Sequence, residues 1–135
     1  MKNLLLIFIF CIMVFWTIYT RFFASQGTLQ LFEYYYLDAV MHFLGGFWLV
    51  GVLGWAIGIK TISRLWILAL AVLVWEAFEL AVFPDVWYLY SRMFPYWLRD
   101  TSSDIIVGLV GGFVAFLIEK YQKRHRVRRE ELITN

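Results

Sequence analysis

Four long apolar stretches constrain the fold of this chain more than any other feature. They run from 4 to 23, 37 to 59, 65 to 83 and 104 to 121. A helix of about 20 residues crosses a hydrocarbon core of about 30 Å, and a helix satisfies its own backbone hydrogen bonds within lipid. The sequence therefore predicts an all-α, polytopic membrane protein built as a four-transmembrane-helix bundle.

The connections between these stretches are too short for a soluble domain. Only 16% of the residues are charged, whereas soluble proteins carry roughly a quarter. We expect one transmembrane domain, residues 1–122, followed by a basic tail, residues 123–135. The first stretch is expected to stay as a span, because its apolar run lasts through Tyr19 and exceeds the roughly 7 to 15 residues of a signal-peptide core.

The distribution of Lys and Arg predicts the orientation. With four spans, nine of these residues fall on one side and Arg21, Arg92 and Arg99 on the other. Cytoplasmic loops carry the excess of basic residues. We therefore expect a multi-pass protein of the cytoplasmic membrane with both termini in the cytoplasm.

The basic tail is expected to contact anionic lipid, because clustered Lys and Arg next to a span bind negatively charged headgroups. Nucleic-acid binding is not expected, since no recognisable fold carries these charges. No pattern in the sequence indicates the oligomeric state.

Ionisable residues interrupt the apolar spans at their predicted outer ends. Asp38 and His42 are four residues apart and lie on one helical face. Glu79 and Glu76 lie roughly 6 and 11 Å below the end of their span at a rise of 1.5 Å per residue, so both should point into the bundle rather than toward lipid. The candidate polar pocket comprises Asp38, His42, Glu76, Glu79, Arg99, Asp100 and Asp104.

Four interpretations of this cluster remain open. Several acids at low dielectric need cations, hydrogen bonds or shifted pKa values. The first interpretation is a structural network, in which Arg92, Arg99, Thr101, Ser102 and Ser103 compensate the acids. The second is a pocket for a polar headgroup or another small ligand.

The third interpretation is a divalent metal site at His42, Glu79 and Asp104. Carboxylates with one histidine suit Mn²⁺ or Mg²⁺ better than a nitrogen- or sulfur-rich zinc site does. The fourth is an ion or proton path, which the absence of comparable groups from the inner halves of the spans disfavours.

The pattern does not decide between an enzyme and a binding protein. His42, oriented by Asp38, is the natural general base near neutral pH, but no residue stands out as a nucleophile. Ser102 and Ser103 are expected to cap the helix that Asp104 starts, because short polar side chains satisfy free N–H groups at a helix N-terminus.

Glycines mark the faces on which the spans should pack. Gly45 and Gly46 continue the face of His42, whereas Gly51, Gly54 and Gly58 fall nearly opposite and include a small-x-x-x-small pair. Such pairs let two helices approach closely. In the last span, the glycines at 108, 111 and 112 extend the face of Asp104 inward.

Three motifs in order resemble the VanZ-like superfamily of small membrane proteins. They are Asp38-Ala39-Val40-Met41-His42-Phe43, Glu76-Ala77-Phe78-Glu79 and Asp100-Thr101-Ser102-Ser103-Asp104, the last followed by Gly108 and Gly111-Gly112. Those families show an Asp-x-x-x-His-Phe motif, a Glu-containing span and an Asp-x-x-x-Asp motif entering a Gly-rich span.

Two departures place the resemblance closest to the YjdF-like branch. Ala39 stands where VanZ-like members often carry a basic residue, and Val107-Gly108 stands where many carry an Asn-x-x-Gly pattern. The resemblance implies a bacterial-type membrane protein with a role at the cell envelope.

These observations lead to one working hypothesis and one alternative. The hypothesis is an integral membrane protein whose outer-leaflet pocket binds a polar envelope component, such as a lipid headgroup, with a divalent metal as an open option. The alternative is a non-catalytic membrane protein whose polar cluster is structural or mediates assembly.

Overall fold

The computed structural model describes residues 2–22, 37–82 and 84–134. These form α1 (Lys2–Phe22), α3 (Leu37–Gly51), the π-helical segment η1 (Val52–Ala56), α4 (Thr61–Val82), α5 (Pro84–Arg92) and α6 (Phe94–Thr134). Every element within the described ranges is helical, which confirms the predicted all-α class. The predicted connection between the first two spans, residues 24–36, lies outside the described residues.

Three of the helices are long and apolar enough to cross a membrane. Their spans are Leu37–Ala56, Ile62–Val82 and Phe94–Arg126. The fourth, α1, contributes a shorter apolar run, Asn3–Tyr19. The predicted stretches at 37–59 and 65–83 therefore correspond to helices of nearly the same extent.

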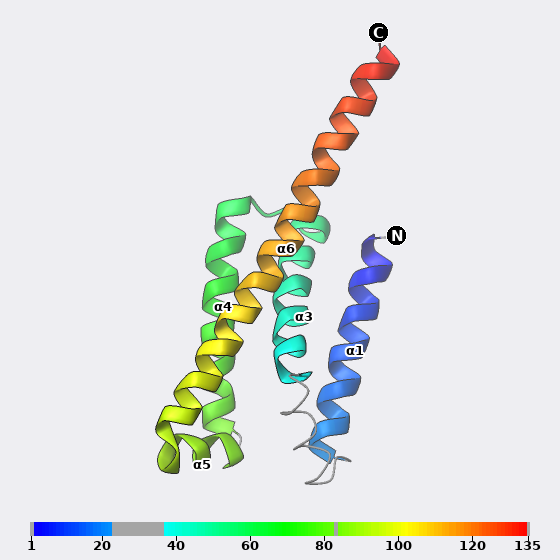
Figure 1. Cartoon of the computed structure of the whole chain (residues 1–135). Helices are drawn as coiled ribbons and strands as arrows, with labels where there is room; N and C mark the ends of the chain where they lie inside the picture. The colour runs from blue at the N-terminus through cyan, green and yellow to red at the C-terminus, as the bar shows by residue number, and fades with distance from the viewer. Residues whose placement is uncertain (1, 23–36, 83, 135) are drawn as a thin grey trace.

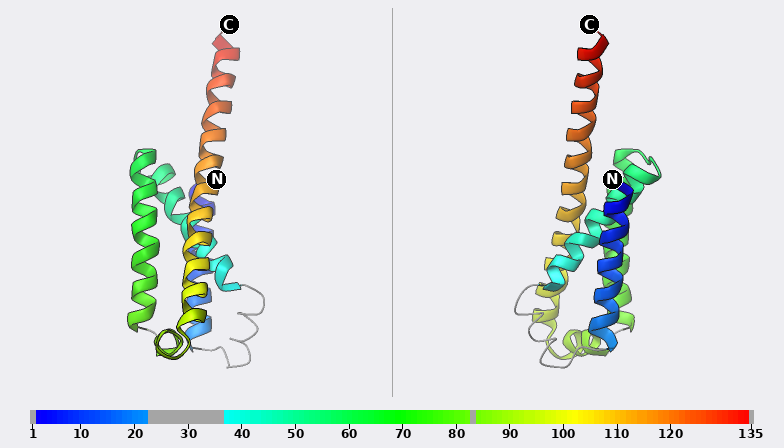
Figure 2. Two further views of the ribbon diagram at one scale, coloured as in Figure 1. Left: turned by 60° about the vertical axis from the view of Figure 1, so that its left-hand side comes forward. Right: turned by 90° about the vertical axis from the view of Figure 1, so that its right-hand side faces the viewer.

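The helices form an elongated bundle with α5 lying across one end (Figures 1 and 2). Helix α3 contacts α1 on one side and α6 on another, while α4 contacts α6 and α3. The far part of α6 continues beyond the other helices, and the N-terminal end of α1 points toward that same end (Figure 1). We call the two ends of the bundle the α5 end and the tail end.

Helices α3 and α6 cross with their backbones in contact. A Cβ atom at Gly46 would overlap the carbonyl oxygen of Gly108, and a Cβ atom at Gly111 would overlap that of Phe43. Two helices approach this closely only where small residues face each other. Gly46 of α3 and the glycines of α6 thus meet across this crossing, and Val50, Leu68 and Ala115 form the buried core beside it.

Three glycines of the second span were predicted to share the face opposite His42. In the structure they have three different surroundings. A Cβ atom at Gly51 would lie 2.8 Å from Leu6 Cδ2 of α1, whereas one at Gly54 would overlap the Arg64 guanidinium of α4. Gly58 has φ +78° and lies outside the helix, so its prediction as a helix-packing residue was wrong. Backbone with this φ favours glycine, and the Ile59 N–H closes the turn by donating to the Leu53 carbonyl at 2.8 Å.

The predicted helix start at Asp104 was also wrong, because α6 begins ten residues earlier. Phe94 is its first residue and Pro95 its second; proline is favoured in the first turn, where its missing N–H has no helical partner to lose. The Ser102 hydroxyl donates to the Leu98 carbonyl at 2.6 Å within the helix, so Ser102 does not cap a helix start.

Helix α6 is much longer than a single membrane crossing. Its 41 residues correspond to about 61 Å at 1.5 Å per residue, twice the hydrocarbon thickness of about 30 Å. The described part of the basic tail is thus a helical continuation of the last span.

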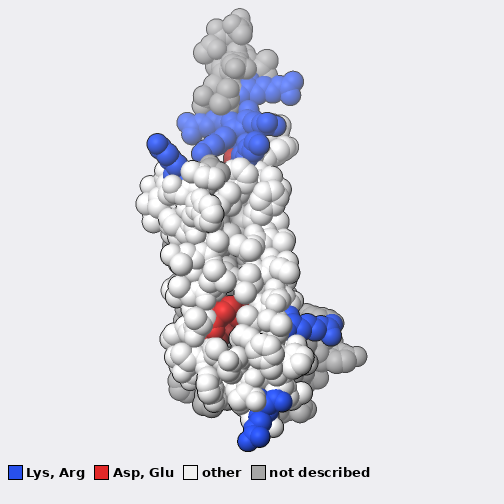
Figure 3. Space-filling view, turned by 90° about the vertical axis from the view of Figure 1, so that its left-hand side faces the viewer, with Lys and Arg blue, Asp and Glu red and all other residues white. Residues whose placement is uncertain are grey.

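Large apolar side chains cover the outer surface of the bundle. On α4, Trp66, Leu70 and Val74 are between 58% and 73% exposed. Contiguous apolar surface of this kind marks contact with an apolar partner or a membrane. In Figure 3, uncharged residues cover most of the face shown, and basic residues gather near the tail end.

A candidate polar binding site

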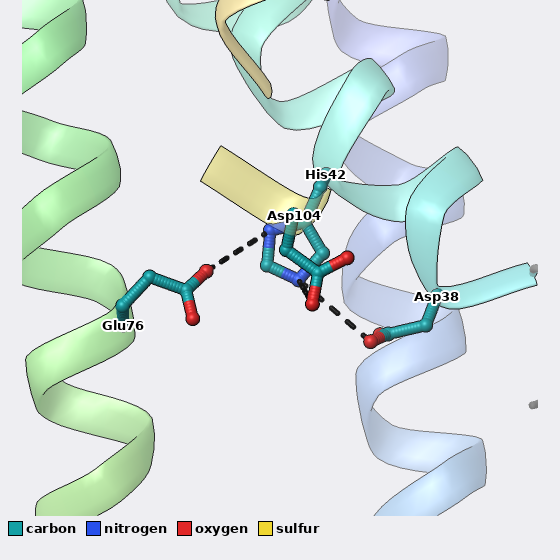
Figure 4. A network of polar contacts seen from close by, with 4 residues as sticks. All are labelled: Asp38, His42, Glu76 and Asp104. Atoms are coloured by element: carbon teal, nitrogen blue, oxygen red, sulfur yellow. Dashed lines mark ion pairs between the residues drawn. The ribbon is translucent and has the colours of Figure 1, made fainter. Parts of the chain in front are cut away.

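Three helices bring four ionisable side chains together at the α5 end of the bundle. Asp38 and His42 come from the first turns of α3, Glu76 from α4 and Asp104 from α6 (Figure 4). The spacing of Asp38 and His42 places them on one face of α3, and the crossing of α3 with α6 brings Asp104 to the same place. We call these four residues the His42 cluster.

The imidazole of His42 lies at the centre of this cluster. Its Nδ1 atom is 3.6 Å from Glu76 Oε1, and its Nε2 atom is 3.9 Å from both Asp38 Oδ2 and Asp104 Oδ2. These separations exceed an ordinary N–H···O hydrogen bond, whose donor and acceptor lie about 2.7 to 3.2 Å apart. Each ring nitrogen therefore faces a carboxylate without a close hydrogen bond to it (Figure 4).

Three of the four side chains are buried. The side chains of His42, Glu76 and Asp104 are only 9%, 10% and 9% exposed, whereas Asp38 is 61% exposed at the mouth of the cluster. An acidic patch surrounded by uncharged residues also appears on the side of the bundle shown in Figure 3. The cluster thus extends from the buried interior of the bundle, at His42, Glu76 and Asp104, to its accessible surface at Asp38.

The charges that act on the buried acids are themselves negative. Asp38, Asp100 and Glu79 act on both Glu76 and Asp104, with no Lys or Arg among the influences on either group. Thr101 supplies Glu76 with a side-chain hydrogen bond. Even so, Glu76 Oε1 is buried and has no hydrogen-bond partner within the described residues. Arg92 and Arg99, which were expected to compensate these acids, have exposed side chains, and neither is among the charges that act on Glu76 or Asp104.

Of the remaining predicted site residues, Glu79 lies directly beside this cluster. Glu79 is half-buried on α4 and forms a group with His42 and Glu76 whose potential ligand atoms lie within 4.8 Å of one another. Asp38, His42 and Asp104 form a second such group. The predicted metal set of His42, Glu79 and Asp104 is thereby divided between two groups that share His42. Asp100 and Arg99 are exposed.

A second ionic cluster at the tail end was not predicted. The Arg64 guanidinium of α4 donates to Glu119 Oε2 of α6, and Lys123 Nζ lies 2.7 Å from Glu119 Oε1. Arg64 and Glu119 are 3% and 4% exposed. The expectation that the half of the bundle opposite the His42 cluster holds no comparable ionisable groups was wrong.

One feature of the sequence points to an ionic group at the tail end: Glu119 lies near the end of the long apolar run of the last span. Only the structure shows that Gly54 leaves room for the Arg64 side chain. The sequence predicts Arg64 only as a basic residue of a loop, because no neighbouring residue indicates that its side chain turns back into the bundle.

The aromatic connection before the last span folds as α5 and the first turn of α6. Tyr90 of α5 contacts Phe94 and Trp97 of α6, with ring centroids 5.7 and 5.0 Å apart. Trp87 adds a third ring contact to Tyr90 at 5.5 Å. The edge-to-face contacts of Tyr90 with Phe94 and Trp97 hold α5 against α6 at the end of the bundle where the His42 cluster lies.

Comparison with known proteins adds no further assignment. No family model matches the chain, and no curated protein or solved structure matches it.

The chemistry open to the His42 cluster follows from its geometry alone. An imidazole flanked by carboxylates can hold a cation or accept a proton. The excess of negative charge favours a positively charged ligand, because like charges at low dielectric repel strongly.

Proposed function

We propose that this chain is a four-helix integral protein of the cytoplasmic membrane with both termini in the cytoplasm. The apolar run of α1 supports a fourth crossing, since lipid tolerates a helix of this composition beside α3. The excess of Lys and Arg near the tail end supports the orientation. The motif resemblance to the YjdF-like branch of the VanZ-like superfamily belongs to the same proposal.

In this orientation the His42 cluster lies in the outer half of the membrane and binds the polar headgroup of an envelope lipid. The observation that carries the proposal is the convergence of buried acids around His42 with carboxylates as their charged neighbours. A cluster that only held the helices together would pair its acids with basic side chains. The arrangement instead suits an amine of a headgroup, or a phosphate bound through a metal ion.

The location of the cluster also fits a lipid ligand. The Asp38 side chain is largely exposed, while the side chains of His42 and Asp104 are buried behind it. A headgroup entering from the membrane surface would meet Asp38 first, and the apolar outer faces of the helices would accommodate its acyl chains.

The test compares two Asp→Asn substitutions on the same helix, one turn apart. Asp104 is buried in the cluster, whereas Asp100 is exposed. Purified variants are mixed with phosphatidylethanolamine and phosphatidylglycerol in detergent, and bound lipid is counted by native mass spectrometry. We expect Asp104→Asn to lose the retained lipid and Asp100→Asn to keep it, with both variants folded.

The alternative of a purely structural network gives the opposite result. Removing one partner of a buried ionic set typically costs about 3 to 5 kcal/mol, so Asp104→Asn would then unfold at a much lower temperature. A large loss of stability with unchanged lipid retention would refute the proposed binding function.

A further inference from the structure

The two ring nitrogens of His42 face different carboxylates: Nδ1 faces one and Nε2 faces two. Nδ1 faces Glu76 at 3.6 Å, and Nε2 faces Asp38 and Asp104 at 3.9 Å. A neutral imidazole has one unprotonated nitrogen and one N–H. His42 can therefore ligate a metal ion through one nitrogen while its other nitrogen donates a hydrogen bond.

The Glu76 side of the ring has the features of a ligand position. Glu76 Oε1 is buried and lacks a hydrogen-bond partner among the described residues, and it points toward Nδ1 in Figure 4. A buried carboxylate oxygen without a partner is unfavourable. A cation between Glu76 and the ring would supply that partner.

The separations on this side also match the spacing of ligands around one ion. Two ligand atoms bound at about 2.1 Å with tetrahedral or octahedral angles lie roughly 3.0 to 3.5 Å apart. Nδ1 and Glu76 Oε1 are 3.6 Å apart, close to that range. Glu79, one turn along α4, forms a group with His42 and Glu76 in which one ligand atom of each residue lies within 4.8 Å of the others.

We propose that the Glu76 side of the His42 cluster, together with Glu79, is a divalent-cation site whose protein ligands are His42 Nδ1, Glu76 and Glu79. The proposal rests on the proposed function, since it requires the cluster to bind a ligand. Asp104 is a positioning residue: its carboxylate faces Nε2 at 3.9 Å, where its negative charge favours the proton on Nε2 and leaves Nδ1 unprotonated toward the ion. Metal-bound histidines commonly have such a carboxylate on their second nitrogen.

The reverse assignment, with the ion at Nε2, fits less well. Asp38 would have to be a ligand there, yet its side chain is 61% exposed. Both Nε2 distances are 3.9 Å, longer than the 3.6 Å on the other side. Oxygen ligands with a single nitrogen favour Mn²⁺ or Mg²⁺ over softer metals, so Mn²⁺ is the appropriate probe.

The experiment uses the full chain in detergent, stripped of metal with a chelator and titrated with Mn²⁺. Binding is followed by electron paramagnetic resonance, which also detects a directly coordinated imidazole nitrogen. We expect one Mn²⁺ per chain with a nitrogen coupling that disappears in His42→Ala. Thermal unfolding of each variant shows whether it is folded.

Four substitutions that preserve side-chain shape separate the two assignments. Asp104→Asn should weaken Mn²⁺ binding by about 10- to 100-fold, the usual effect of losing a positioning carboxylate. Glu76→Gln and Glu79→Gln should each weaken binding more than Asp104→Asn does. Asp38→Asn should weaken binding less than Asp104→Asn does, because the Asp38 side chain is 61% exposed. Glu76 and Glu79 are tested separately, so if one of the two variants folds poorly, the other still measures the contribution of a glutamate to Mn²⁺ binding.

Two results would overturn this inference. Strong loss in Asp38→Asn and Asp104→Asn with retained binding in both glutamate variants would place the ion at Nε2 instead. A folded wild-type protein that binds no Mn²⁺ would exclude the cation site altogether. Lipid retention by the metal-free protein is measured separately, so failure of the cation site is distinguishable from failure of headgroup binding.

Discussion

The Arg64 guanidinium, in the first turn of α4, donates a buried hydrogen bond to the carboxylate of Glu119, 55 positions later in α6. Both residues are almost fully buried, and Lys123 reaches Glu119 from the exposed side. This pair joins α4 to α6 at the tail end, while the His42 cluster joins α3, α4 and α6 at the α5 end. The bundle therefore carries one ionic cluster with Lys and Arg partners and one in which acids surround a histidine.

Removing Arg64 should destabilise the protein strongly. Arg64→Ala leaves the Glu119 carboxylate buried with only Lys123 beside it, and loss of one partner of a buried pair typically costs about 3 to 5 kcal/mol. Lys123 is 71% exposed, so Lys123→Ala should cost less than about 1 kcal/mol. Thermal unfolding in detergent compares the two variants, and equal effects would show that burial of the pair is unimportant.

Gly54 should matter chiefly because Arg64 occupies the space in front of it. A Cβ atom at Gly54 would overlap the guanidinium and lie 2.7 Å from Glu119 Oε2. Gly54→Ala should therefore destabilise the wild-type protein by about 1 to 3 kcal/mol, as overpacking usually does. In the Arg64→Ala background the same change should have a smaller effect, because only the contact with Glu119 remains. Additive losses in the double variant would contradict this coupling.

Neighbouring glycines of α3 should respond differently to alanine. A Cβ atom at Gly46 would overlap the backbone of Gly108, whereas nothing lies within 4 Å of one at Gly45. Gly46→Ala must separate α3 from α6 and should lower the unfolding temperature clearly. Gly45→Ala should be neutral or mildly stabilising, because alanine is the better helix former by about 1 kcal/mol. Similar unfolding temperatures would argue against the close crossing.

The orientation is testable with a fusion after Asn135. A reporter that is active only after export should stay silent there, because the basic residues flanking the spans hold that side in the cytoplasm. The same reporter inserted between Ser91 and Arg92, at the α5 end, is the positive control. Activity of the Asn135 fusion would contradict an even number of crossings with cytoplasmic termini.

The part of the tail that follows Lys123 should be dispensable for folding. Residues 120–126 of α6 are exposed, so truncation after Arg126 should leave the unfolding transition unchanged. Truncation after Gln122 also removes the Lys123 contact to Glu119 and should lower the transition slightly. Loss of the folded state after truncation at Arg126 would show that the tail packs on the bundle.

Hydrophobicity and local spacing determined much of what the sequence predicted. Apolar runs of membrane-spanning length require helices wherever they occur, so spans near 37–59 and 65–83 were predictable. Asp38 and His42 share a face because helical geometry depends only on adjacent residues. Gly46 could be recognised as a packing residue for the same reason.

The tertiary structure alone decided which residues meet. The pairing of Arg64 with Glu119 depends on how α4 packs against α6, and no local pattern encodes that packing. The polar segment from Arg99 to Asp104 resembles a helix start, because charged residues avoid lipid, yet the backbone continues as one helix from Phe94. The orientation of His42 between Glu76 and Asp104 likewise requires three helices at once. Local sequence determines helices and faces, whereas contacts between distant segments require the complementary shapes that form only in the packed bundle.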